Sequence, residues 1–145
     1  MLVKQLSVFL ENRKGRLAKL TRVLKENRIN LVALSISDTT NFGILRAIVR
    51  EPEAAATALR GAGFTANITE VLACAVPDQP GGLADVLLLL EQANISVEYL
   101  YSFVRTPGKE ALILLRVDQL PEAIATIEQA GIRSLTHEEV LAYQA

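Results

Sequence analysis

Residues 6–37, LSVFLENRKGRLAKLTRVLKENRINLVALSIS, and residues 72–103, LACAVPDQPGGLADVLLLLEQANISVEYLYSF, share one pattern. A shift of 66 residues aligns them with seven identities, among them Gly15 with Gly81. Each stretch has an apolar run, a glycine-containing turn, a helical run and a second run of alternating apolar residues. A period of this length is typical of a chain built from repeated structural units. The sequence therefore predicts a tandem duplication of a unit of roughly 70 residues.

The duplication continues beyond these two stretches. PEAAAT at 52–57 aligns with PEAIAT at 121–126 at a shift of 69 residues instead of 66. The difference of three residues can be accommodated in the predicted hairpin. We therefore expect a first unit at 1–70 and a second at 71–145. Residues 1–70 carry a net charge of +5 and residues 71–145 a net charge of −6. Opposite charges favour apposition of the two units.

The hydrophobic period changes in the same order in each unit. In the first, the pattern predicts a strand at 3–10, a helix opened by Gly15, strands at 30–38 and 44–49, a helix from Pro52 to Gly63 and a strand at 64–69. The second repeats this order and ends on Thr136-His137-Glu138-Glu139, whose capping-box spacing predicts a short C-terminal helix. With right-handed crossovers, the order βαββαβ gives an antiparallel sheet with both helices on one face. The fold class is therefore α+β, with two tandem ferredoxin-like units.

The composition argues against several classes of protein. Half of the residues are apolar and the net charge is −1, which is typical of a globular chain. No apolar run approaches the roughly 20 residues of a membrane span, and the N-terminus lacks a signal-peptide pattern. A single cysteine and a single histidine exclude an internal disulfide and a Cys/His zinc site. The cytoplasm is therefore the expected location. With no recognisable acid–base pair, we expect a protein that is not an enzyme and has no cofactor.

The turn from the first strand to the first helix carries the most chemical information. Its sequence is Glu11-Asn12-Arg13-Lys14-Gly15-Arg16-Leu17. The corresponding turn of the second unit is Pro77-Asp78-Gln79-Pro80-Gly81-Gly82-Leu83. Glycine at the head of a helix lets a ligand approach the backbone, where free N–H groups and the helix dipole favour a carboxylate. The Asn12 amide both donates and accepts, which suits an amino acid. The alternative is a plain tight turn in which Asn12 or Asp78 caps the helix.

The motif N-R-x-G-x-L at 12–17 and I-N-L at 29–31, set in the order βαββαβ, resembles the ACT domain. ACT domains are small amino-acid-binding regulatory modules of enzymes of amino-acid metabolism. The resemblance covers nearly the whole chain as two tandem copies, like the family's stand-alone tandem proteins. It implies that two units pair side by side into one eight-stranded sheet with the effector at their interface.

Within the family the effector is held by the Asn and Gly of one turn and by the Asn that opens the second strand of the neighbouring unit. The first unit matches this pattern, whereas the second has aspartate and serine at the two asparagine positions. We therefore expect the two sites to differ. The resemblance implies ligand-binding residues at Asn12, Lys14, Gly15, Arg16, Leu17, Asn30, Asp78, Gly81, Gly82, Leu83 and Ser96.

Other features suggest less. The aromatic alternation Tyr99-Tyr101-Phe103 suits packing against helices better than half of a pocket. The run Leu87–Leu90 must point around its helix, which favours helix packing between units or in a dimer. Cys74 is expected to be a buried structural residue. The basic residues of the first helix are interpreted as a solvated face and not as a nucleic-acid site.

These observations predict a non-catalytic regulatory protein that binds a free amino acid between its two ACT units. The alternative is an accessory subunit that acts mainly by contact with an enzyme of amino-acid metabolism. An acylphosphatase-like enzyme on the same fold would need a longer glycine-rich cradle than this turn offers. The expected partners are the effector and a second copy or a partner enzyme, with neither nucleic acid nor membrane.

Overall fold

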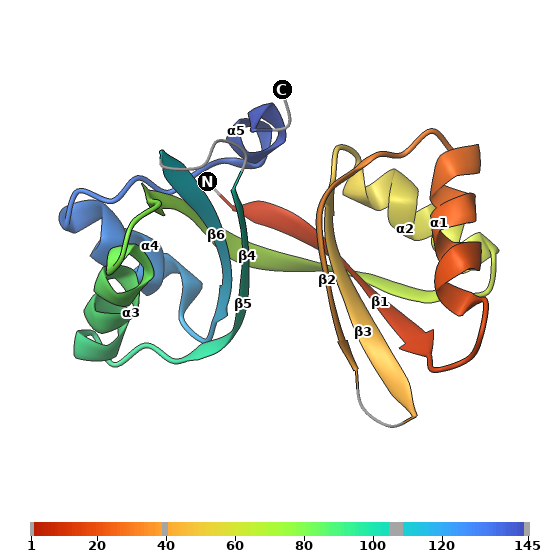
Figure 1. Cartoon of the computed structure of the whole chain (residues 1–145), viewed down its shortest axis with the longest axis horizontal. Coiled ribbons are helices and arrows are strands. Elements are labelled where there is room, and N and C mark those ends of the chain that lie inside the picture. Colours follow the sequence, from red (N-terminus) through yellow and green to blue (C-terminus); the bar gives the residue numbers. More distant parts are fainter. Residues whose placement is uncertain (1, 39–40, 105–108, 144–145) are drawn as a thin grey trace. The chain divides into compact units, whose positions relative to one another are not determined.

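A computed structural model describes residues 2–38, 41–104 and 109–143 of the chain (Figure 1). The first six elements are β1 (Val3–Glu11), α1 (Arg16–Glu26), β2 (Leu31–Asp38), β3 (Phe42–Val49), α2 (Pro52–Gly61) and β4 (Thr65–Pro77). The remaining five are α3 (Gly82–Gln92), β5 (Val97–Val104), β6 (Glu110–Val117), α4 (Leu120–Gln129) and α5 (His137–Ala142). Both hairpins and all five predicted helices are present. None of the helices in the described ranges is long and apolar enough to cross a membrane.

The hydrogen-bonded strand order is β2-β3-β1-β4-β6-β5. The pairs β1–β3, β2–β3, β4–β6 and β5–β6 are antiparallel. Two strands expected at 64–69 and near 72–76 are in fact one continuous strand, the 13-residue β4. The chain divides into two compact units inside this strand: one is Lys4–Thr69, and the other begins at Glu70 and also includes Val3. The eight-stranded pairing of the two units stays a prediction.

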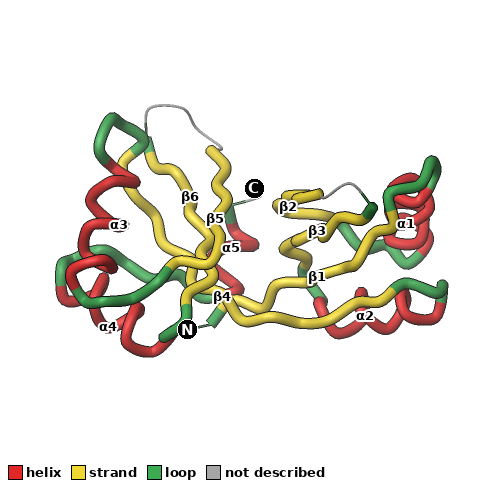
Figure 2. Tube along the Cα trace, turned by 90° about the horizontal axis from the view of Figure 1, so that it is seen from below, coloured by secondary structure: helices red, strands yellow, loops and turns green. Residues whose placement is uncertain are grey.

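The first unit has one core beneath both of its helices. On β1, alternate residues Leu6 and Val8 are fully buried, and Val8 lies opposite Leu45 of β3. These side chains share an apolar cluster with residues of α1 and α2, so the two helices cover the same sheet face (Figure 2). Helix α1 contributes Leu20, Val23 and Leu24 to this core. Such burial of apolar surface is the main source of stability in a domain of this size.

The second unit repeats this core but ends differently. Leu72 and Cys74 of β4 pack in a cluster with Val86 of α3 and Ile127 of α4. The expected final strand is reduced to one isolated bridge between Cys74 and Ser134. A strand there would need consecutive pairing with β4, but α5 begins three residues later. The second unit therefore lacks the sixth element of the predicted order.

Helix α5 is the predicted C-terminal helix, and its capping box is confirmed. The Thr136 hydroxyl accepts from the Glu139 N–H, and the Glu139 carboxylate accepts from the Thr136 N–H, both at 3.1 Å. Within this unit, α5 lies on the sheet face opposite α3 and α4 (Figures 1 and 2). Its Val140 and Leu141 are buried. Unlike the first unit, the second thus has helices on both faces of its sheet.

Candidate functional site

Gly15 sets the backbone conformation of the β1–α1 turn. Gly15 has φ +89°, a left-handed conformation that strongly favours glycine. The Arg16 N–H donates to the Arg13 carbonyl at 3.2 Å, and the Lys19 N–H donates to the Gly15 carbonyl at 2.9 Å. Leu17 and the residue after it precede the first intrahelical bond, so their N–H groups face the open end of α1. This is the arrangement of donors that an anion needs.

A cavity of about 180 Å³ opens beside this turn, and all of its lining belongs to the first unit. Its polar side contains Asn12, whose backbone N–H donates to the Asn41 carbonyl at 3.0 Å. Its apolar side is formed by Leu17, which is 43% exposed, and Ile36, which is 41% exposed. The full lining is Leu10, Glu11, Asn12, Arg13, Leu17, Ile36 and Gly43.

The charges of the turn are arranged around Glu11. One carboxylate oxygen lies 2.9 Å from the Arg13 Nε, and the other lies 3.8 Å from an Arg16 guanidinium nitrogen. Arg16 itself is only 16% exposed, and its guanidinium lies 4.2 Å from the centre of the Phe64 ring. Among the residues that the structure describes, no acceptor bonds its buried Nε. Arg16 is therefore packed against the core and is not part of the cavity lining.

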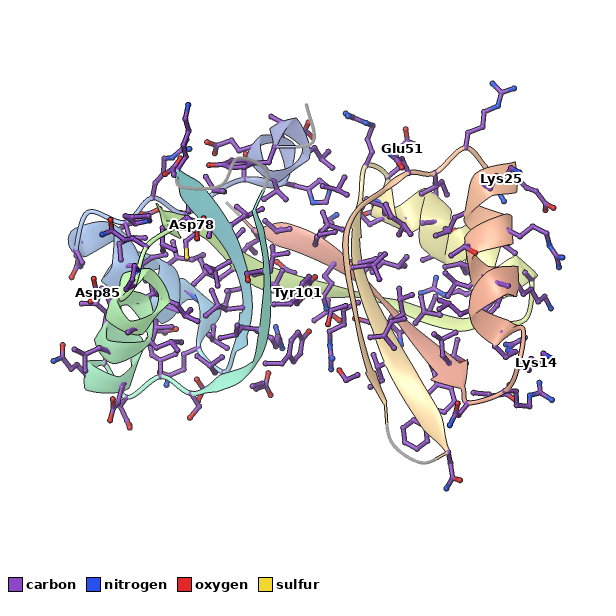
Figure 3. The ribbon with its side chains drawn as sticks, in the orientation of Figure 1. Lys14, Lys25, Glu51, Asp78, Asp85 and Tyr101 are labelled. Atoms are coloured by element: carbon purple, nitrogen blue, oxygen red, sulfur yellow. The ribbon has the colours of Figure 1, made fainter. Side chains whose placement is uncertain are left out.

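The other residues expected in the first site lie apart. Lys14 is exposed in the turn before α1, whereas Lys25 lies near the far end of that helix (Figure 3). Asn30 follows that far end, so the 11 residues of α1 separate it from Asn12. At about 1.5 Å per residue, the helix keeps the two asparagines roughly 16 Å apart within one unit. They can hold one ligand only if Asn30 comes from a neighbouring unit.

The β4–α3 turn of the second unit has the same backbone form. Gly81 has φ +91°, and the Asp85 N–H donates to the Gly81 carbonyl at 3.0 Å. The Asp78 N–H donates to the Lys109 carbonyl at 2.8 Å. Gly82 is buried, and a Cβ there would lie 2.3 Å from the Pro77 carbonyl oxygen. Asp78 is labelled in Figure 3.

The N-cap residues of α1 and α3 are Gly15 and Gly81, both in the αL conformation, so neither Asn12 nor Asp78 occupies the N-cap position. A plain tight turn stays the alternative to a ligand site. Ser96, the counterpart of Asn30, lies in the α3–β5 loop, where its N–H donates to an Asp118 carboxylate oxygen at 3.0 Å. Ser96 lines a separate pocket of about 300 Å³, together with Leu87 and Glu91 of α3.

A family model, described as ACT domain pair, matches residues 1–142. The chain belongs to this family. Protein BT0572 from Bacteroides thetaiotaomicron is 38% identical with a TM-score of 0.91, over 97% of this chain and 96% of that one. The regulatory subunit of aspartate kinase from Thermus thermophilus is 15% identical with a TM-score of 0.65, over 89% of this chain and 93% of that one. The corresponding Thermus flavus subunit is 14% identical with a TM-score of 0.61, over 90% and 94%. No curated protein matches this chain.

At these identities the two kinase subunits show a common fold only. The ACT resemblance inferred from the Asn-Arg-x-Gly-x-Leu motif is thus confirmed at the level of family and of repeated unit. The assignment of individual ligand-binding residues is a separate question, and it rests on the geometry of the first unit.

Five lining residues of the ACT cavity were not in the set expected from the sequence: Glu11 and Arg13 of the turn itself, and Leu10, Ile36 and Gly43 of the strands. Gly43 lies opposite Leu10 in the β1–β3 register, and Ile36 lies opposite Leu45 in the β2–β3 register. The two-residue alternation of β2 marks Ile36 as facing one side of the sheet. Only the register brings it beside the turn, so the sequence carried a signal for its face but not for its neighbours.

The two tyrosines of β5 lie on the face away from α3 and α4. Tyr99 and Tyr101 are opposite Arg116 and Leu114, whereas Leu100 is opposite Leu115 of the helix-side core. Figure 3 shows Tyr101 on the side of β5 away from α3. Packing against those helices, the favoured interpretation, is therefore wrong for the two tyrosines. The side chain of Phe103 lies outside the described residues.

The remaining candidates are the Cys74 thiol and the possible metal ligands. Cys74 is buried in the second core, and burial raises the pKa of its thiol to about 12. A thiol that stays protonated is a poor nucleophile and a poor metal ligand. No cluster of three or more His, Cys, Asp or Glu side chains suited to a metal ion occurs within the described ranges.

Proposed function

We propose that this chain is a non-catalytic regulatory protein that binds a free amino acid at the β1–α1 turn of its first ACT unit. The observation that carries the proposal is the cavity in which Asn12 stands beside the open end of α1. A ligand carboxylate would accept from the turn N–H groups that follow Gly15. The Asn12 amide would orient the ammonium group, and Leu17 would contact the side chain.

The ligand would complete its site across a pair of ACT units. In this arrangement the paired unit supplies the residue that opens its second strand, Asn30 or Ser96. Because a helix of 11 residues separates each of these residues from the turn of its own unit, a ligand that contacts both would hold one unit against another. Such coupling between ligand occupancy and unit pairing is the physical basis of an allosteric signal. We place the protein in the cytoplasm, as a homodimer or bound to an enzyme of amino-acid metabolism.

A thermal-melt screen against the twenty amino acids at millimolar concentration tests this function. A ligand at a hundred times its Kd stabilises the folded state by about 2.7 kcal/mol, which raises the Tm of a chain this size by several degrees. The expected result is a shift with one amino acid or a few related ones. No shift with any of the twenty would overturn amino-acid binding.

Variants of three asparagines then locate the ligand. Asn12→Ala should abolish the shift, and Asn67→Ala, an exposed asparagine of β4, is the matched control. Asn30→Ala should also weaken the shift if Asn30 reaches the ligand from a paired unit. An unchanged shift in Asn12→Ala would show that the ligand binds elsewhere.

A second candidate function, an accessory subunit that works by protein contact, is favoured by one surface. On α3, Leu88 is 51% exposed while Leu90 is fully buried, so the leucine run does present an apolar side chain to solvent. The structural neighbours named as regulatory subunits of aspartate kinase are consistent with an enzyme partner. Leu88→Lys should abolish co-purification with a large enzyme under this hypothesis and leave amino-acid binding intact.

A further inference from the structure

We propose that the cavity of the first unit selects an amino acid with an aliphatic side chain and that the second unit has no equivalent site. This inference rests on the proposed amino-acid-binding function and names the class of its ligand. It depends on three features: the size and lining of the cavity, the pairing of the charges at its rim, and the residues that replace the lining in the second unit.

The cavity has the size and polarity of a small amphipathic ligand. Its volume of about 180 Å³ is well below the roughly 300–1,000 Å³ of sites for drug-sized molecules. Leu10, Leu17 and Ile36 form its apolar wall, and Asn12 stands at its polar end. A bound amino acid with its charged groups at the Asn12 end would direct its side chain at this wall.

Two charged residues also line the cavity, but they neutralise each other. The Glu11 carboxylate and the Arg13 Nε are 2.9 Å apart, and Glu11 also lies near the Arg16 guanidinium. An acidic ligand side chain would have to draw Arg13 away from Glu11, and a basic one would have to displace Arg13 from it. An aliphatic side chain requires neither change, so the geometry favours it.

The second unit replaces the lining at the corresponding register positions. Ile36 lies opposite Leu45, and its counterpart Ser102 lies opposite Ile113. Gly43 lies opposite Leu10, and their counterparts Ala111 and Val76 are also opposite each other.

In the second unit, Ser102 therefore gives a more polar surface where the first unit has Ile36. Ala111 adds a methyl group where the first unit has Gly43. Aspartate in place of Asn12 would repel a ligand carboxylate. The two turns share a backbone form, but the described residues at the second turn differ from those that line the first cavity.

Titration calorimetry of the full chain with single amino acids tests the ligand class. Leucine, isoleucine and valine should bind, with about one ligand per chain. Each buried methylene contributes about fourfold in affinity, so leucine should bind at least about tenfold more tightly than alanine. Aspartate and lysine should bind more weakly than alanine. Tight binding of a charged amino acid that Asn12→Ala abolishes would overturn the aliphatic class and leave the proposed function standing.

Two variants that import second-unit residues sharpen the test. Gly43→Ala adds a methyl group at a lining position inside strand β3. Ile36→Ser removes the apolar wall. Each should weaken leucine binding about tenfold and change alanine binding less.

Leu34→Ser is the matched control, because Leu34 lies on the same face of β2 and is 49% exposed but does not line the cavity. Equal losses in Leu34→Ser and Ile36→Ser would contradict the assignment. Binding of no amino acid at all would instead overturn the proposed function, and two ligands per chain would overturn the restriction to the first unit.

Discussion

The two units differ most sharply at the position after the helix-head glycine, where the first has Arg16 and the second has Gly82. Gly15 and Gly81 share the same left-handed backbone, so the turn itself is common to both. Arg16 packs its guanidinium on the Phe64 ring. Gly82 instead lies so close to the Pro77 carbonyl that a Cβ would clash with it. The shared feature, a positive φ at one glycine, is therefore required by the fold. The contacts of the residue that follows this glycine differ between the two units.

The largest expected effect comes from adding a methyl group at Gly82. Because the opposing atom is a backbone oxygen 2.3 Å from the Cβ position, Gly82→Ala must displace the turn. Overpacking of this kind costs about 1–3 kcal/mol, and we expect about 2 kcal/mol of lost unfolding free energy in urea titrations.

Gly61→Ala provides the control, since its Cβ would meet no atom within 4 Å. Gly61 is in helix α2, where alanine is favoured, so this variant should keep or slightly raise stability. If Gly82→Ala were as stable as Gly61→Ala, the close approach to Pro77 would not be a real constraint.

The ends of the two units give the second comparison. The first unit runs directly into the second through β4, whereas the second unit ends on the capped helix α5. Thr136→Ala removes the hydroxyl that accepts from the Glu139 N–H and should cost about 1 kcal/mol. Thr126→Ala is a suitable control, because its hydroxyl donates to the Glu122 carbonyl inside a helix and not at a cap. Equal losses of stability in the two variants would argue against a capping role.

The C-terminal ends of α1 and α3 provide a smaller test. Arg28 and Asn94 occupy equivalent positions with φ +58° and +59°, and each is followed by a hydrogen bond from Ile29 or Ile95 back to its helix. Asparagine tolerates this left-handed conformation better than arginine does. Arg28→Asn should therefore raise the unfolding free energy by about 0.5 kcal/mol, and Asn94→Arg should lower it by a similar amount. Changes of the same sign in both variants would contradict this explanation.

How far the sequence could predict this molecule depends on the kind of feature. Helix starts at Gly15 and Gly81 and the capping box at Thr136 are local signals, and all three were predicted correctly. The continuity of β4 was not, because nothing between Phe64 and Val76 distinguishes one long strand from two that meet without a turn.

The candidate site also combines residues with a local sequence signal and residues that only strand pairing brings together. The Asn12 turn was visible as a motif, and Leu17 was part of that motif. Leu17 is half-exposed and lines the cavity, as a ligand-contacting residue would. Ile36 and Gly43 join the cavity through strand register, which pairing across the sheet decides.

The pH dependence of α5 gives the smallest expected effect. Hydrogen bonding from the Thr136 backbone N–H, with help from the Thr136 hydroxyl and Arg133, lowers the pKa of Glu139 below its ordinary value of 4.5. A carboxyl whose pKa is lower in the folded state stabilises the fold above its unfolded pKa and loses that contribution as the pH falls through the folded value. The stability difference between the natural chain and Glu139→Gln should therefore be constant near pH 7 and shrink below about pH 4.5. Denaturant titrations at several pH values measure it, and a difference that persisted in acid would mean that the ionised carboxylate does not support the cap.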